Sequence, residues 1–172
     1  MKKTLCAFAL ILLSTLGFIA CEKDDICGKD EPTTPSFLIE FYDYNDQNIG
    51  KTALVEAYVA GREKDLIRSS GNKLRLPLKL DQPETSWILQ TSQIVNNQTI
   101  TVKDTLTFKY IVNTHYLNRA CGYVSTFSLK QDGSSPTLNG EANIFTGNWI
   151  KHYITQTNEI ADEKKAHFKI YY

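Results

Sequence analysis

KLRLPLKL, residues 73–80, is the stretch that decides the fold class, because apolar and polar residues alternate along all of it. Leucine takes every even position, and the odd positions carry lysine, arginine or proline. A period of two is typical of a β-strand with one face on a core and the other in water. Pro77 cannot donate to a neighbouring strand, so the stretch is predicted to be an edge strand.

The same period recurs on both sides of this stretch. Residues 37–42, 85–91 and 104–116 alternate in the same way, and 95–98 (VNNQ) predicts a hairpin turn. No segment sustains a period of 3.6. The other expected strands are 52–59, 66–67, 99–102, 121–129, 138–145, 149–155 and 166–172. We therefore expect an all-β fold, an antiparallel two-sheet sandwich of immunoglobulin-like type, with a small barrel as the alternative.

The first twenty residues are typical of a secretory signal peptide. Lys2 and Lys3 precede the uncharged run 5–20, which ends in a small residue. A helix needs about 20 apolar residues to span a bilayer, so this shorter run predicts a cleaved signal helix. An uncleaved single-span anchor is the alternative.

Residues 18–21, FIAC, resemble a bacterial lipobox, with Phe18 in place of the usual leucine. The resemblance implies that Cys21 is diacylated and becomes the first mature residue. Several acyl chains anchor a protein firmly where one does not. The alternative is that Cys21 forms a disulfide.

The charged residues after Cys21 resemble the surface-export signal of Bacteroidetes lipoproteins, a lysine followed by two acidic residues. They are Glu22, Lys23, Asp24 and Asp25. The resemblance implies a protein that faces outward from the outer membrane. A solvated charged tether is the alternative.

The remaining cysteines predict one disulfide. Cys6 lies in the signal and Cys21 takes the lipid, which leaves Cys27 and Cys121 in an oxidising compartment. Such a bridge closes a long loop and thereby stabilises the folded protein by about 4–5 kcal/mol, because it lowers the entropy of the unfolded chain. Free thiols or a metal pair are the alternatives, although two cysteines without nearby histidines make a poor zinc site.

Domain organisation and charge follow from these assignments. We expect a signal peptide at 1–20, a tether at 21–36 and one sandwich domain at 37–172. The full chain has 19 basic and 19 acidic residues, and two of the basic ones leave with the signal. This balance predicts no nucleic-acid partner.

Residues with catalytic or metal-binding potential are scattered. The three histidines are His115, His152 and His167. His152 and His167 come near each other if 149–155 and 166–172 pair as a hairpin, but nothing in the sequence requires metal ligands to converge there. Residues 43–50 offer several oxygens for calcium but lack the glycine and the closing glutamate of an EF-hand. There is no nucleophile elbow and no phosphate loop. We predict no enzyme, no metal and no cofactor.

Two further features concern glycans. Asp104-Thr105-Leu106 resembles the O-glycosylation sequon of exported Bacteroidetes proteins, which makes Thr105 a candidate acceptor; a threonine opening a strand is the alternative. Trp87 and Trp149 are candidates for a stacking platform that binds sugars. Burial of both in the core is the alternative.

Blocks over the whole mature chain resemble an uncharacterised family of small Bacteroidetes lipoproteins. They are CEKDDIC (21–27), PTTP (32–35), FLIEFYD (37–43), DTLTFKY (104–110), RACGY (119–123), WIK (149–151) and AHFKIYY (166–172). The resemblance implies a lipid-anchored domain and transfers no catalytic or ligand residue.

The sequence thus predicts a lipid-anchored, surface-exposed outer-membrane lipoprotein that is an interaction or structural module. Its expected partners are the membrane, through the lipid, and an envelope protein or a glycan. A periplasm-facing lipoprotein of envelope assembly and a glycan-binding accessory protein are the alternatives.

Overall fold

The computed structural model describes residues 26–172, which contain twelve strands and no helix. The expected signal helix lies outside the described residues. The chain divides into two compact units. The smaller one joins the segment that ends at Glu31 to Tyr116–Tyr123, and the larger one comprises Pro32–His115 and Val124–Tyr172.

Most strands are short, and two are long. The strands are β1 (Phe37–Tyr42), β2 (Val55–Tyr58), β3 (Ile67–Arg68), β4 (Lys73–Leu76), β5 (Glu84–Val95), β6 (Gln98–Asn118), β7 (Gly122–Leu129), β8 (Thr137–Leu138), β9 (Glu141–Ala142), β10 (His152–Thr155), β11 (Glu159–Ile160) and β12 (Phe168–Tyr171).

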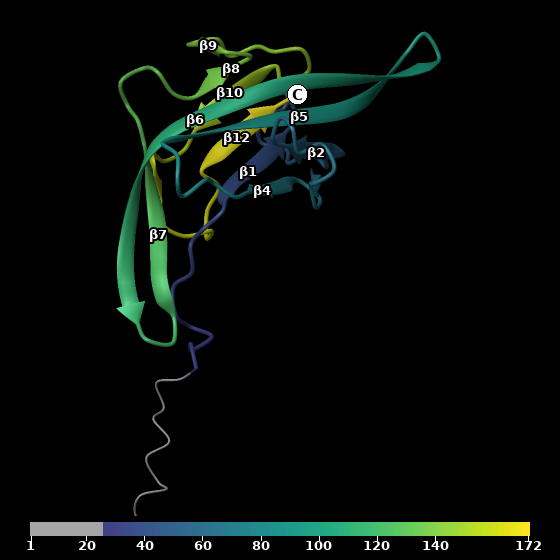
Figure 1. Ribbon diagram of the computed structural model, residues 1–172. Coiled ribbons are helices and arrows are strands. Elements are labelled where there is room, and N and C mark those ends of the chain that lie inside the picture. Colours follow the sequence, from purple (N-terminus) through teal and green to yellow (C-terminus); the bar gives the residue numbers. More distant parts are fainter. Residues whose placement is uncertain (1–25) are drawn as a thin grey trace, which may run out of the picture. The chain divides into compact units, whose positions relative to one another are not determined.

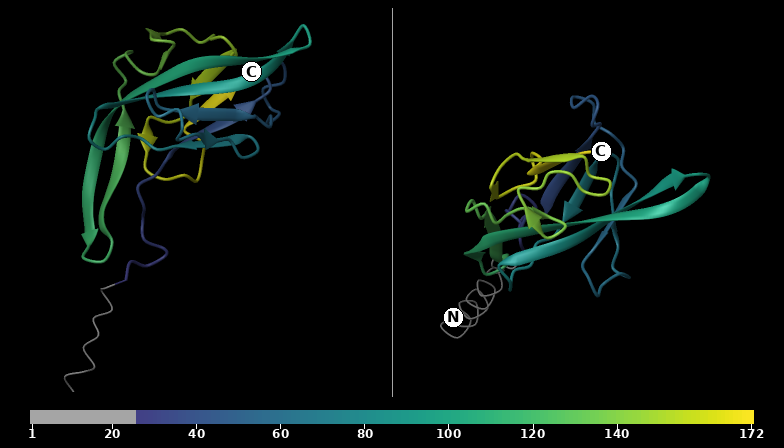
Figure 2. Two further views of the ribbon diagram at one scale, coloured as in Figure 1. Left: turned by 45° about the vertical axis from the view of Figure 1, so that its right-hand side comes forward. Right: turned by 90° about the horizontal axis from the view of Figure 1, so that it is seen from above.

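The strands form two sheets, which confirms the predicted sandwich. The smaller sheet has the order β10-β12-β1-β4, and the larger has β11-β7-β6-β5-β2-β3, with β8 and β9 attached to β6. Figures 1 and 2 show β5 and β6 lying over β1 and β12. One pair departs from the expected antiparallel pattern: β1 and β12 run parallel, with Ile39 opposite Phe168. No hairpin joins these two strands, so their direction is not constrained by a tight turn.

The stretch 73–80 forms an edge strand, as predicted, but a shorter one. β4 covers Lys73–Leu76, and β1 is its one neighbouring strand among those that the structure describes. It ends immediately before Pro77, which has no N–H to offer a neighbour. Beyond the proline the alternation no longer predicts burial, because Leu78 is buried whereas Leu80 is exposed.

Aromatic side chains fill the space between the sheets. Phe108 of β6 lies 4.3 Å from Phe37 of β1, between ring centroids, and 5.4 Å from Phe168 of β12. All three rings are fully buried. Pairs of this kind stabilise beyond the area they remove from water. The core therefore joins the middle of the larger sheet to the first and last strands of the chain.

A buried carboxylate fastens the two sheets at a second place. Asp104 of β6 is fully buried and accepts four hydrogen bonds. Its Oδ1 receives the backbone N–H of Asn148 (2.7 Å) and the amide Nδ2 of Asn139 (2.8 Å). Its Oδ2 receives the backbone N–H groups of Trp149 (2.9 Å) and Ile150 (3.0 Å). The segment that leads into β10 is thereby bound to the larger sheet.

The Asp104 carboxylate restricts which residue can stand beside it. A Cβ at Gly147 would collide with the Asp104 carboxylate, so glycine is required there. Trp149 follows in the same segment, and its indole Nε1–H donates to the carbonyl of Leu89 on β5 (3.1 Å). One side chain thus positions a whole connecting segment.

We expect Asp104→Asn to lower the free energy of unfolding by about 3 kcal/mol or more, because charge-assisted bonds are lost and an amide N–H₂ faces backbone N–H groups. Gly147→Ala should also destabilise, and its effect should not add to that of Asp104→Asn, because both act through one carboxylate. Urea unfolding measures both. Asp65→Asn, at an exposed aspartate, is the control and should change little. A small effect of Asp104→Asn would contradict the clamp.

Candidate functional site

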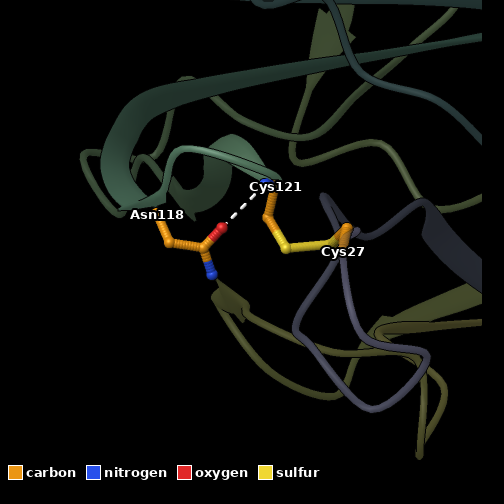
Figure 3. Close-up of a disulfide and its surroundings, with 3 residues drawn as sticks. All are labelled: Cys27, Asn118 and Cys121. Atoms are coloured by element: carbon orange, nitrogen blue, oxygen red, sulfur yellow. Dashed lines mark hydrogen bonds between the residues drawn. A yellow bond between two sulfur atoms is a disulfide. The ribbon is translucent and has the colours of Figure 1, made fainter. Parts of the chain in front are cut away.

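The predicted disulfide is present. Cys27 and Cys121 are bonded, with their Cα atoms 4.8 Å apart and a sequence separation of 94 (Figure 3). The Cys121 N–H donates to Oδ1 of Asn118 at 2.8 Å, which orders the turn between β6 and β7. The bridge therefore holds the segment that ends at Glu31 to this turn, within the smaller unit.

Two exposed tyrosines lie in the same unit. Tyr116 and Tyr123 pack edge to face, with ring centroids 5.3 Å apart, and are 56% and 72% exposed. They are candidates for contact with a partner, because tyrosine combines a large apolar ring with a polar tip.

The predicted anchor and export residues, Cys21 and Glu22, Lys23, Asp24 and Asp25, lie outside the described residues. Among residues 26–172, no helix is both long and apolar enough to cross a membrane.

The end of the predicted tether, residues 32–36, belongs to the larger unit and is hydrogen-bonded within it. Oγ1 of Thr34 accepts the N–H of Ser125 on β7 (2.9 Å), and Pro35 is buried. The N–H of Ser36 donates to Oε1 of Glu163 (2.7 Å), whose Oε2 accepts from Nε of Arg75 on β4 (2.7 Å). Burial raises the pKa of Glu163, but these hydrogen bonds outweigh it and hold the pKa below its ordinary value.

His167 holds β1 at a second point. It is 3% exposed, its Nδ1 accepts the N–H of Leu38 (2.9 Å), and its Nε2 lies 2.8 Å from the carbonyl of Asp162. Both bonds are made only by a neutral ring with the proton on Nε2. Burial lowers the pKa of His167, while the Asp162 carbonyl and the charges of Asp162 and Glu163 oppose the shift.

The histidines and the loop 43–50 were the two candidate metal sites weighed from the sequence, and the described residues do not assemble a site at the histidines. β10 and β12 pair as expected, but the register sets His152 opposite Tyr171, whereas His167 lies beyond the other end, next to Gln156. Within residues 26–172, no group of three or more His, Cys, Asp or Glu side chains is arranged to hold a metal.

The loop 43–50 uses its oxygens internally. Oδ1 of Asp43 accepts the N–H groups of Asn45 and Asp46, and its Oδ2 lies 3.2 Å from Nζ of Lys51. This is the hydrogen bonding of an ordinary Asx turn.

Both tryptophans are buried, Trp87 at 5% and Trp149 at 1% exposure, so the alternative of burial in the core holds and they do not form an exposed stacking platform. They lie on the inner faces because the core of the sandwich needs large apolar side chains. Thr105, the candidate glycosylation residue, is half-buried in the middle of β6, and Asp104 of its sequon is fully enclosed.

The β5–β6 hairpin carries the largest group of exposed aliphatic side chains in one element pair. Its two-residue turn is as predicted, with Asn96 and Asn97 at positive φ. Ile94, Val95 and Ile100 near this turn are 79%, 44% and 39% exposed. Residues 85–102 contain no charged side chain. Figures 1 and 2 show this end of the hairpin projecting beyond the neighbouring strands.

The edge of β5 in this projecting part is free. β2 pairs with β5 only as far as Thr91, so residues 92–95 pair only with β6 among the described residues. Exposed strand edges in soluble proteins are usually protected by charges or proline. This edge has neither, which marks it as a candidate site for strand addition.

Sequence reasoning missed Asp104, His167 and Glu163 as structural residues. Asp104 was expected to begin a strand and His167 to lie within the last one, and neither position carries a local signal of burial. Their partners are distant along the chain. Asp104 binds Trp149 across 45 residues, His167 binds Leu38 across 129, and Glu163 binds Ser36 across 127.

These observations define a class: an all-β two-sheet sandwich whose N-terminal segment is held by a disulfide. Residues 55–172 match the family of unknown function DUF6452. This agrees with the expectation of an uncharacterised family. The chain belongs to this family. No curated protein and no solved structure matches it.

We expect acidification to destabilise the protein in the window that begins at about pH 6.5 and extends toward lower pH. The pKa of His167 is lowered in the folded state, so the unfolded chain binds a proton first as the pH falls below its ordinary value of 6.5. Stability is fully present above that value and falls by at most about 1.4 kcal/mol per pH unit below it. Unfolding by urea at several pH values measures the slope.

The matched variants are His167→Gln and His115→Gln. The first should remove the slope in this window, and the second, at an exposed histidine, should retain it. An unchanged slope in His167→Gln would assign the effect to other groups.

Proposed function

We propose that this chain is a lipid-anchored β-sandwich protein of the outer membrane that faces outward and serves as an interaction module. The observation that carries the proposal is the Cys27–Cys121 disulfide. Such bonds form and persist in oxidising compartments outside the cytoplasm. The signal-like residues 1–20 supply a route to such a compartment.

The anchor in this proposal is acylated Cys21. It lies six residues before Cys27, so the lipid is followed almost at once by a covalent bond to the β6–β7 turn. Several acyl chains hold a protein at a membrane where one is marginal. Lys23, Asp24 and Asp25 supply the outward orientation. A periplasm-facing lipoprotein is the alternative if these residues act only as a charged tether.

The interaction surface in this proposal is the free edge of β5 at residues 92–95. The partner is an envelope protein that adds an extended, uncharged strand to this edge. A stretch without charges from 85 to 102 accepts such a strand without burying an unpaired charge. The exposed Ile94 beside this edge provides apolar contact.

The anchor is tested by intact mass and peptide mapping of membrane-extracted protein, before and after reduction. We expect an N-terminal peptide that begins at acylated Cys21 and a Cys27–Cys121 cross-linked peptide. Surface labelling of intact cells then compares Lys23→Ala/Asp24→Ala/Asp25→Ala with a charge-matched control, Lys29→Ala/Asp30→Ala/Glu31→Ala. Only the first variant should lose labelling. No labelling of the unchanged protein would favour the periplasm-facing alternative, and equal labelling of both variants would show that Lys23, Asp24 and Asp25 do not direct export. An unmodified chain cleaved elsewhere would remove the lipid anchor.

The surface is tested with a photoreactive amino acid at Gln93 in living cells. We expect one discrete cross-linked envelope protein, whose cross-link disappears in Ile94→Lys, because a charge at an edge opposes strand addition. Ile49→Lys is the control, since Ile49 is 56% exposed and lies in the loop after β1. A cross-link that persists in Ile94→Lys, or none at all, would contradict this surface.

A further inference from the structure

A cavity of about 650 Å³ opens beside β5 in the larger unit. Its apolar wall includes Ile67 of β3, Leu78 after β4 and Trp87 of β5. It is therefore lined both by the margin of the larger sheet and by the chain that follows the edge strand of the smaller one. Small-molecule sites typically have this size. Half of the residues that line this cavity are apolar and half are polar.

Trp87 gives this cavity a specific chemical feature. Its side chain is 95% buried, and its indole Nε1 has no hydrogen-bond partner among the described residues. Buried polar groups are nearly always paired, so each exception calls for a cause. Trp149 provides the contrast within the same core, since its Nε1–H donates to Leu89. The unpaired donor thus belongs to the tryptophan that lines the cavity.

The rim of the cavity is polar and electrically balanced. Arg62 and Lys79 line the cavity together with two carboxylates, Asp65 and Asp81. No salt bridge of the described chain involves these four residues. Equal numbers of both signs give little net attraction for a charged ligand. Nζ of Lys79 donates to Oε1 of Gln82 (2.9 Å), another lining residue, and retains further donors for neutral groups of a ligand.

We propose that this cavity binds a small uncharged amphiphile, with its alkyl or acyl part on the apolar wall and a hydroxyl or carbonyl oxygen that accepts the Nε1–H of Trp87. Nε1 is shielded from solvent, so binding displaces side chains of the cavity wall slightly. The polar rim then receives the rest of the head group. This inference does not rest on the lipid anchor or on the β5 edge, and it stands or falls separately from them.

The experiment follows the two indole N–H resonances by NMR as n-octyl β-D-glucoside is added below its micelle concentration. The protein is the chain from residue 21 with Cys21→Ser, which contains every described residue. We expect a saturable low-field shift of the Trp87 resonance and a constant Trp149 resonance. Assignment uses Trp87→Phe. Absence of a shift at Trp87, or equal shifts of both indoles, would overturn the proposal.

Two variants locate the binding. Ala60→Phe places a ring at an exposed position of the cavity lining and should abolish the Trp87 shift. Ala161→Phe, at an exposed alanine outside the lining, is the matched control and should leave it unchanged. Calorimetry on Trp87→Phe should show affinity about three- to tenfold weaker, the value of one neutral hydrogen bond. A shift that survives Ala60→Phe would place the detergent elsewhere and overturn the assignment.

Discussion

The carboxylate of Asp104 is the constraint on which the sandwich depends, because it alone satisfies four donors in the interior. Three of these donors are consecutive backbone N–H groups of the segment that leads into β10. With the carboxylate in place, the segment crosses from the larger sheet to the smaller one without unpaired amides. Gly147 is required beside it, and the Trp149 indole then reaches Leu89. One side chain and its acceptor geometry thus help to fix the relative placement of the sheets, together with the aromatic core.

The long strands β5 and β6 combine two physical roles in one hairpin. Their inner halves carry fully or almost fully buried side chains such as Leu89 and Phe108, which build the core. Their outer halves are exposed and uncharged, and form a surface suited to strand addition. The cavity beside Trp87 lies at the margin of the same hairpin. A rigid sandwich therefore supports both candidate binding regions, as expected for sites carried by the edges of a stable scaffold.

Features that depend on neighbouring residues were predicted correctly, whereas features that depend on contacts between distant residues were not. Residues 37–42 were predicted as a strand and β1 has these bounds, because alternation is a local property of a half-buried strand. The turn at Asn96 and Asn97 was also correct, since asparagine tolerates positive φ. The parallel pairing of β1 with β12 and the separation of His152 from His167 were not predicted, because register between distant strands depends on the whole fold.

The all-β class and the edge position of β4 could be read from the chain, because periodicity and a missing proline N–H are local properties. The pairing of Cys27 with Cys121 was predicted by assigning Cys6 to the signal and Cys21 to the lipid, and the disulfide is present. Tertiary packing decides which polar groups lie inside and what they bind. Asp104 finds its donors 35 to 46 residues away, His167 meets Leu38 across 129 residues, and Trp87 finds no acceptor at all within the described chain. Hydrogen bonds between such distant groups exist only after both sheets have packed, so no local pattern of residues encodes them.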